Sequence, residues 1–451
     1  MRHGTRPPRW ALVALAVSAL VTAGRLRAQD AADARPLTIE AAVETALAHH
    51  PSLAIARNQL QAAQGATRQS RSGLLPSLGL NSGYSRSKST GSAVVGGVPV
   101  GSSGARYSTQ YSTAFQGQHL LFDFGRTRDQ HRQSRFQQLA RRHDLAQTED
   151  DVIYNVQQAF LVLLANQELL EVARHAVRLS EGSLAMAQAQ FDAGAAPRAD
   201  VAKAASALAA ARLQVTSAEN AVALSHVSLN EAMGLDVLSP HEIAPPAEAD
   251  VAETTPEALV QAATTHRPEL LAARAEADAA DAGLDAAQKG QLPALDLSAA
   301  LGWRDPTFPA SNQYWNLGLS LSLNVFDAGL TRGQKTQARA QRDAALNTIR
   351  LLEQQVAEET VQTYLDLRTA DQEIVAAEVG VASADEDLQL AQGRYQADVG
   401  ILLEVLDAQS ALTTAQGELA QARFRRATAR YALERALGMS LSELSATIEN
   451  G

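Results

Sequence analysis

The most regular feature of the sequence is a series of small and apolar residues spaced alternately four and three positions apart. The series consists of Val152, Val156, Ala159, Leu163, Asn166, Leu170, Ala173, Val177, Ser180, Leu184, Ala187 and Phe191. A spacing of about 3.5 residues is typical of a helix that winds around partner helices. Residues 126–191 contain no proline. We therefore predict one helix of roughly 66 residues, which at about 1.5 Å per residue is on the order of 100 Å long.

Four shorter stretches alternate apolar and small polar residues with a period of two, which predicts β-strands with one apolar face. The alternating positions are Leu78, Leu80 and Tyr84; Tyr107, Thr109, Tyr111, Thr113 and Phe115; Leu295, Leu297, Ala299, Leu301 and Trp303; and Trp315, Leu317, Leu319, Leu321, Leu323 and Val325. Residues 85–105 are mostly Ser, Gly, Thr and Val, so we expect a flexible surface loop between the first two strands.

The order of helix, strand pair, long helix and return helix occurs twice, which indicates an internal duplication. At an offset of 217 residues, His50-Pro51-Ser52-Leu53 corresponds to Arg267-Pro268-Glu269-Leu270, and Leu75-Pro76 to Leu292-Pro293. At an offset of 204 residues, Phe122-Asp123-Phe124-Gly125 corresponds to Phe326-Asp327-Ala328-Gly329, and Met233-Gly234 to Leu437-Gly438. The difference places 13 extra residues in the first strand pair.

These correspondences divide the chain into a first repeat over 29–235, a connector over 236–256 and a second repeat over 257–439. In the first repeat we predict a helix at 38–73, a hairpin at 74–122, a long helix at 125–192 and a return helix at 197–233. In the second repeat we predict a helix at 257–290, a hairpin at 294–326, a long helix at 329–397 and a return helix at 401–437. Residues 440–451 form a C-terminal tail. Pro51 predicts a break within the first helix, because proline disfavours helical backbone in the residue before it.

Residues 1–28 have the character of a secretory signal peptide. Three arginines precede an apolar stretch of about a dozen residues, and cleavage after Ala23 or after Ala28 fits the small residues there. Outside this stretch no run of about 18 apolar residues occurs, so no membrane-spanning helix is predicted. We therefore expect the protein to be exported.

The strands also fit a transmembrane barrel, in which apolar side chains face lipid and polar ones face the interior. A barrel in lipid must close, because unpaired backbone groups cost several kcal/mol each in hydrocarbon. Four strands cannot close by themselves, so the chain must oligomerise. Two copies would supply eight strands and a barrel filled by side chains, whereas three copies would supply twelve strands and leave a lumen.

Taken together, these features resemble the TolC-like outer-membrane efflux proteins over residues of about 37–439. The resemblance rests on the two repeats, the paired Phe-Asp-x-Gly motifs, and Arg394-Tyr395 followed by Glu404-Val405-Leu406-Asp407-Ala408-Gln409. It implies a mainly α protein with a β-barrel portion, assembled as a homotrimer with a 12-strand barrel in the lipid of the cell outer membrane. It also implies an α-helical tunnel in the periplasm that docks to a periplasmic adaptor (a membrane fusion protein) and an inner-membrane pump.

The resemblance places the periplasmic tips at the turns 193–197 and 397–400. Gly194 matches the tip glycine of the family, while Asp398 stands at the corresponding position of the second repeat and Gly400 follows two residues later. The resemblance implies that these turns meet the adaptor. The same glycines would serve equally as simple helix caps.

Four residues match the family's pore aperture. Glu404 and Asp407 lie one helical turn apart and so point to one side, and they match carboxylate rings at the narrowest part of the pore. Asp200 and Tyr395 match an aspartate–tyrosine pair that joins neighbouring helices. The alternative reading is that Asp200 and Glu404 are acids in the first turn of a helix, a placement worth about 0.3–1 kcal/mol. The family's locking arginine has no counterpart, because Gly400 occupies its position.

Other classes of function find less support. The formal net charge is −10 at pH 7, which gives no electrostatic basis for nucleic-acid binding. The chain has no cysteine, its histidines show no metal-ligand spacing, and no nucleophile or phosphate-loop motif occurs, so we predict no enzyme, metal or cofactor. The competing hypothesis is a soluble periplasmic coiled-coil adaptor or scaffold, although such a protein does not need repeated strand pairs. Small toxic molecules, metal ions and unfolded polypeptide all remain candidate cargo.

Overall fold

The computed structural model describes residues 36–95, 98–245 and 255–441, and the side chains of residues 90–106 are not described. The predicted signal peptide, residues 246–254 of the connector and most of the C-terminal tail lie outside these ranges. No helix in the described ranges is both long enough and apolar enough to cross a membrane.

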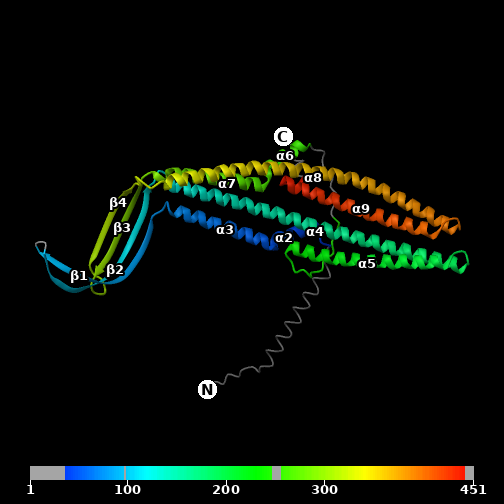
Figure 1. Ribbon diagram of the computed structural model, residues 1–451, viewed down its shortest axis with the longest axis horizontal. Helices are drawn as coiled ribbons and strands as arrows, with labels where there is room; N and C mark the ends of the chain where they lie inside the picture. The colour runs from blue at the N-terminus through cyan, green and yellow to red at the C-terminus, as the bar shows by residue number, and fades with distance from the viewer. Residues whose placement is uncertain (1–35, 96–97, 246–254, 442–451) are drawn as a thin grey trace, which may run out of the picture. The chain divides into compact units, whose positions relative to one another are not determined.

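The chain is mainly helical, with one antiparallel sheet, and the predicted duplication is confirmed by the bounds of its elements (Figure 1). The long helices α4 (Arg126–Asp192) and α8 (Leu330–Gln396) both have 67 residues, and the return helices α5 (Arg198–Met233) and α9 (Leu402–Leu437) both have 36. The shorter helices are α2 (Ile39–His49), α3 (Pro51–Ser72), α6 (Pro256–His266) and α7 (Pro268–Gln288), the last followed by the 3-10 turn η1 (Lys289–Gln291). These elements form two compact units, and each unit contains segments of both repeats.

The backbone of the two repeats agrees even where the side chains differ. Positive φ angles occur at Phe124, Gly125, Gly194 and Gly234, and again 204 residues later at Ala328, Gly329, Asp398 and Gly438. Left-handed backbone is uncommon for residues other than glycine, so its recurrence at fixed spacing reflects the turns themselves. The duplication therefore extends to individual backbone angles.

One unit, composed of Ala54–Gln147 and Thr264–Ala357, contains the sheet. Its strands β1 (Ser77–Val95), β2 (Val98–Phe122), β3 (Ala294–Asp305) and β4 (Gln313–Ser322) lie side by side in that order, each antiparallel to the next (Figure 1). Strands β1 and β4 form the two edges. The face that carries Leu78, Leu80, Trp315 and Leu317 is exposed, with 59–76% of each of these side chains accessible.

Two strand predictions are wrong in extent. Residues 85–105, expected to form a surface loop, continue β1 to Val95 and begin β2 at Val98, with their backbones paired in antiparallel register. Ser, Thr and Gly carry little apolar signal, but a hairpin satisfies their backbone hydrogen bonds without requiring a hydrophobic face. At the other edge β4 ends at Ser322, so Leu323 and Val325 lie beyond the strand.

The helix predicted at 257–290 is in fact two helices, α6 and α7, separated at Arg267. Its φ and ψ of −60° and 124° are extended, because Pro268 disfavours helical backbone in the residue before it. His50, with φ and ψ of −65° and 127°, marks the corresponding break before Pro51 in the first repeat. The sequence predicts the break at Pro51, and the duplication requires the second one.

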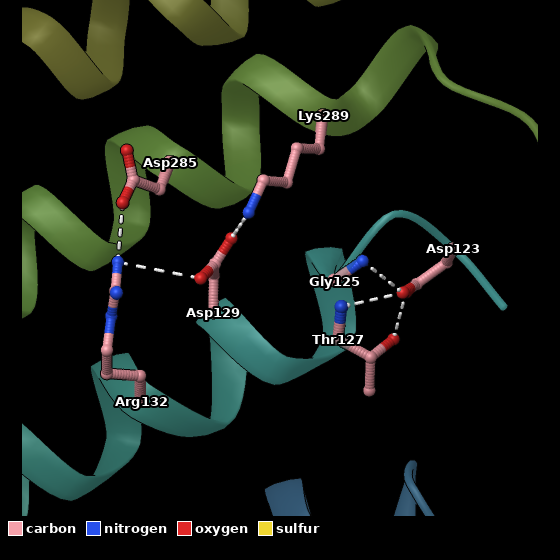
Figure 2. A network of polar contacts seen from close by, with 7 residues as sticks. All are labelled: Asp123, Gly125, Thr127, Asp129, Arg132, Asp285 and Lys289. Carbon is pink, nitrogen blue, oxygen red and sulfur yellow. Dashed lines mark hydrogen bonds and ion pairs between the residues drawn. The ribbon is translucent and has the colours of Figure 1, made fainter.

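A carboxylate organises each junction between sheet and long helix, and Figure 2 shows the first of them, at Asp123. Asp123 accepts hydrogen bonds from the backbone N–H of Gly125 at 3.0 Å and of Thr127 at 2.8 Å, and from the Thr127 hydroxyl at 2.6 Å. Asp327 makes the same three bonds to Gly329 and Thr331. Each carboxylate thereby occupies N–H groups at a helix start that have no partner within the helix.

These bonds also fix the charge of the two aspartates. Burial alone raises the pKa of Asp123, but the hydrogen bonds from Thr127 and Gly125 and the charge of Arg126 outweigh it, so the pKa lies below its ordinary value. The bonds from Thr331 likewise lower the pKa of Asp327. Both groups are therefore anionic at neutral pH.

A second polar network joins α4 of the first repeat to α7 and η1 of the second (Figure 2). Asp129 is buried and forms an ion pair with Lys289, while Arg132 lies 3.5 Å from Asp129 and 2.5 Å from Asp285. At the matching offsets, Gly333 replaces Asp129 and Ser72 replaces Lys289. The same network therefore cannot form between α3 and α8.

The other unit contains α2, α5, α6 and α9 with the remaining parts of α4 and α8. Along α4, the predicted seam is buried or half-buried from Val152 to Ala187, while Phe191 is 38% exposed. One core joins α2, α4 and α5 around Phe160, and a second joins α4, α5, α8 and α9 around Val405. The second core lies beside the two helical turns and holds them together.

Candidate functional site

The turns between α4 and α5 and between α8 and α9 have the same hydrogen-bond geometry. In the first turn, the N–H groups of Ala195 and Ala196 both donate to the carbonyl oxygen of Gln190, at 2.8 and 3.2 Å. In the second turn, the N–H groups of Val399 and Gly400 both donate to the carbonyl oxygen of Arg394, at 3.0 Å each. These bonds satisfy carbonyls at a helix end through left-handed caps.

The three predicted tip residues occupy different environments within these turns. Gly194 has φ of +78° and Asp398 has φ of +60°, and both are exposed. Aspartate is among the few residues other than glycine that adopt this conformation readily. A Cβ on Gly194 would meet no atom within 4 Å, whereas one on Gly400 would lie 3.0 Å from the Cβ of Arg394. Close approach of the chain therefore favours glycine at position 400, and positive φ favours it at position 194.

Tyr395 connects the two turns, although not through its hydroxyl. The residue is only 3% exposed, and its carbonyl oxygen accepts a hydrogen bond of 2.9 Å from the side-chain amide of Gln190. Its hydroxyl has no hydrogen-bond partner among the described residues, so no bond to Asp200 forms. Burial, followed by the charges of Asp200 and Asp398, raises the pKa of Tyr395 above its ordinary value. Asp200 thus acts on Tyr395 through its charge.

Glu404 has a partner that the sequence analysis did not identify. The Arg394 guanidinium lies 3.4 Å from a carboxylate oxygen of Glu404, and both side chains are about half exposed. Position 400 holds glycine, and the cation stands six residues earlier, at Arg394 near the end of α8. Gln190 and Asp200 occupy the matching positions of the first repeat. The ion pair is therefore particular to the second turn.

Asp407 differs from Glu404 although they lie one turn apart on α9. Asp407 is exposed, whereas Glu404 is half-buried, and only Glu404 has an ion pair within the described chain. The two carboxylates are thus electrostatically unequal: one has an adjacent cation and the other meets solvent.

A buried polar contact behind the turns was also missed. The side-chain amide of Gln409 on α9 donates to the Ser183 hydroxyl at 2.5 Å and to the carbonyl oxygen of Leu179 at 3.1 Å. Ser183 is fully buried and Gln409 is 6% exposed. Gln409 is the last residue of the Glu404–Gln409 motif that carries the family resemblance. Ser183 lies between the seam positions Ser180 and Leu184 of α4, and no spacing rule pairs it with Gln409.

Within the described ranges, no cluster of three or more His, Asp or Glu side chains could hold a metal ion. The polar groups near the turns instead form helix caps, one ion pair and hydrogen bonds between helices. This arrangement can fix or release the ends of helices.

Several proteins of known function resemble this chain along most of its length. The pyoverdine export outer membrane protein OpmQ of Pseudomonas aeruginosa is 25% identical over 402 residues, covering 89% of this chain and 85% of its own. The toluene efflux pump outer membrane protein TtgC of Pseudomonas putida is 26% identical over 405 residues, covering 88% of this chain and 82% of its own.

Solved structures share the fold. The outer-membrane channel OprN matches with a TM-score of 0.78 at 23% identity, covering 89% of this chain and 90% of its own. The outer membrane protein VceC of Vibrio cholerae matches with a TM-score of 0.77 at 22% identity, covering 89% of this chain and 96% of its own. A family model described as outer membrane efflux protein matches residues 42–235 and 259–439, which are most of both repeats. The chain therefore belongs to the outer membrane efflux protein family.

Proposed function

We propose that this protein is the passive exit duct of a tripartite efflux or type I secretion system. It would receive cargo from a periplasmic adaptor and an inner-membrane pump and release it outside the cell. The observation that carries this proposal is the family match across both repeats, combined with a four-stranded sheet that is apolar on one exposed face. The family match supports a channel rather than a soluble adaptor.

The sheet supplies the reason for assembly. β1 and β4 each have one edge without a neighbouring strand in the described chain, and such edges are costly in lipid. Three copies would join β4 of one chain to β1 of the next and close a barrel of twelve strands. The face with Leu and aromatic side chains would then contact lipid, and the face with Ser, Gly and Asn would line the lumen.

The two helical turns supply a docking surface and a gate. Gly194, Asp398 and Gly400 would lie at the adaptor-docking tip, where small or short side chains let another helix approach closely. Asp200, Tyr395, Glu404 and Asp407 would form the aperture. In this proposal Arg394 replaces the missing arginine by joining the end of α8 to the start of α9.

Extraction and conductance test the proposal together. The full-length protein, expressed with its signal sequence, should remain in the membrane after osmotic shock and dissolve only in detergent. Reconstituted into planar bilayers, it should give discrete, reproducible conductance steps. Release by osmotic shock, or detergent-extracted protein without such steps, would overturn the assignment as a duct.

A further inference from the structure

The register of the sheet identifies which side chains share its apolar face. In β1 these are the even-numbered residues, and in β2, β3 and β4 the odd-numbered ones, because Leu80 pairs with Phe115, Phe115 with Leu301, and Leu301 with Trp315. Beyond the leucines, the same face carries Tyr84, Tyr111, Trp303 and Trp315. Such a band of aromatic side chains marks the margin of the apolar zone in barrel proteins.

Two cations lie on this face just beyond the aromatic band. Arg86 and Lys88 follow Tyr84 at two-residue steps and are exposed, like Tyr107, which pairs with Lys88 across the strands. The guanidinium carbon of Arg86 lies 5.1 Å from the centre of the Tyr107 ring, and the Lys88 ammonium lies 5.8 Å from it. One aromatic ring therefore positions two positive charges side by side.

No carboxylate neutralises these charges in the described structure. Among the described residues, the contacts of Arg86 and Lys88 are with the Tyr107 ring, and residues 74–122 contain no Asp or Glu in a chain of net charge −10. Asp305 is the carboxylate that the register places on the same face, opposite Tyr111. It is engaged by its own loop, accepting hydrogen bonds from Thr307, Ser311 and Asn312.

The height of the cations on the barrel agrees with a lipid headgroup. Arg86 and Lys88 follow Leu78 by about 8–10 residues, or roughly 26–33 Å along a strand. At a strand tilt of about 40°, this corresponds to roughly 20–25 Å along the membrane normal, close to the height of about 25 Å for the apolar band of outer-membrane barrels. Because α3 and α4 attach at the other end of these strands, this level is the outer leaflet.

We propose that Arg86, Lys88 and Tyr107 form a site for the phosphorylated headgroup of a glycolipid in the outer leaflet of the outer membrane. The inference rests on the proposed barrel, which makes this face the lipid-facing one, but not on the adaptor, the pump or the gate. Guanidinium and ammonium groups are the usual partners of phosphate. The site also lies where the first hairpin extends past the second, so each chain would carry it once.

The experiment uses full-length protein purified in detergent and bisphosphorylated lipid A as the probe, with bound lipid measured by native mass spectrometry. Wild type should retain lipid A and bind its dephosphorylated form at least tenfold less tightly. R86Q/K88Q should bind lipid A at least tenfold less tightly than wild type, whereas R86K/K88R should retain binding. Arg304 provides a matched control. Its guanidinium carbon lies 4.9 Å from the centre of the Tyr314 ring, and the register places it on the opposite face of the sheet. R304Q should bind lipid A like wild type.

Three results would contradict the proposed site. The first is that R86Q/K88Q binds lipid A as tightly as wild type, and the second is that R304Q weakens binding as much as R86Q/K88Q does. The third is that wild type binds dephosphorylated lipid A as tightly as bisphosphorylated lipid A. The comparison of the two lipids uses wild type only, so it remains decisive if a variant fails to fold. Displacement of lipid A by an equal concentration of inorganic phosphate would assign the site to free phosphate and overturn the lipid proposal. Light scattering on the same sample separates the hypothesis of the lipid site from the hypothesis of the barrel. A detergent-extracted oligomer without phosphate-dependent lipid binding would refute the lipid site alone. A soluble monomer would refute the barrel.

Discussion

Asp123 and Asp327 each hold the start of a long helix with both carboxylate oxygens, and this makes the two junctions sensitive to acid. Each accepts two backbone N–H bonds and one hydroxyl bond, which an ionised carboxylate receives better than a protonated one. The folded-state pKa of both residues is depressed. Their contribution is therefore present above the unfolded-state pKa of about 3.9 and is lost as pH falls through the folded-state pKa.

The variant D123N/D327N should thus reduce the loss of thermal stability between about pH 5 and pH 2.5, while lowering stability at neutral pH. Replacing a helix-start acceptor typically costs about 1 kcal/mol. Circular dichroism melts of the detergent-solubilised protein across this pH range measure the effect. D305N is a useful comparison, because Asp305 at the end of β3 also has a pKa lowered by hydrogen bonds, from Ser311 and Thr307, but holds no helix start. A pH dependence identical to that of wild type would show that these carboxylates do not control the acid response.

Gly194 and Asp398 share a positive φ, so two substitutions at position 194 that carry the same backbone cost can separate the effect of a side chain from the effect of its bulk. Gly194→Asp should retain folding and export, because Asp398 already adopts the same positive φ. Gly194→Trp adds bulk where the chain itself has no atom within 4 Å, so the added ring would meet a docking partner. We expect G194W to lose export while keeping membrane insertion and oligomeric mass. Export assays in a strain lacking the wild-type protein test both variants, and normal export by G194W would place the docking surface elsewhere.

Arg394 makes the two carboxylates of the proposed aperture, Glu404 and Asp407, unequal in a way that bilayer recordings can detect. Because Arg394 lies next to Glu404, the field in the aperture should come mainly from Asp407. D407N should therefore reduce cation selectivity and divalent block more than E404Q does. R394Q should increase both, since it leaves Glu404 without its cation.

Reversal potentials in a salt gradient measure the selectivity, and the double variant E404Q/D407N sets the baseline without either carboxylate. Unchanged selectivity and block in that double variant would mean that both acids only favour the start of α9. Equal effects of D407N and E404Q would instead mean that the Arg394 pair does not persist in the channel.

At the scale of helices, the buried bond between Gln409 and Ser183 joins α9 to α4 behind the turns. S183A removes the hydroxyl and leaves part of the buried Gln409 amide without a partner, which should cost about 1–3 kcal/mol. In S183A/Q409L both polar groups are gone, so the double variant should lose less stability than the two single effects added together. Thermal unfolding of the four proteins completes the cycle. Additive losses would indicate that the two side chains do not depend on each other.

The long helices were predictable, because their seam repeats over many turns and most of its positions are buried, as from Val152 to Ala187. The extent of β1 and β2 was not, because Ser, Gly and Thr between residues 85 and 105 signal a turn when read locally and form strand only through pairing. The break at Arg267 could have been predicted by applying the rule used at Pro51 to its repeat. The Arg394–Glu404 pair could not, since it depends on how the turn brings two helix ends together.

For the assembled molecule, closure of the sheet should determine the mass. Light scattering of detergent-purified protein, corrected for bound detergent, should give about three times the mass of one chain, because three sheets of four strands close a barrel with a lumen. Truncation of the β1–β2 extension between residues 90 and 105 should leave this mass unchanged, since β2 pairs with β3 only from Tyr111 onward. A stable monomer with intact strands would refute the closure argument.

The division of the chain into two units, each assembled from both repeats, has a consequence for synthesis. Around Val405, the core that holds the turns combines Ala187 and Ala204 from the first repeat with Leu388 and Leu412 from the second. When residue 235 has been translocated, the first repeat is complete, yet this core lacks its other half. The nascent chain must therefore pass through the periplasm with an uncovered apolar seam, and its productive folding depends on the interval before the second repeat arrives. A ribosomal pause near the connector should consequently increase degradation of the protein more than an equal pause near the C-terminus.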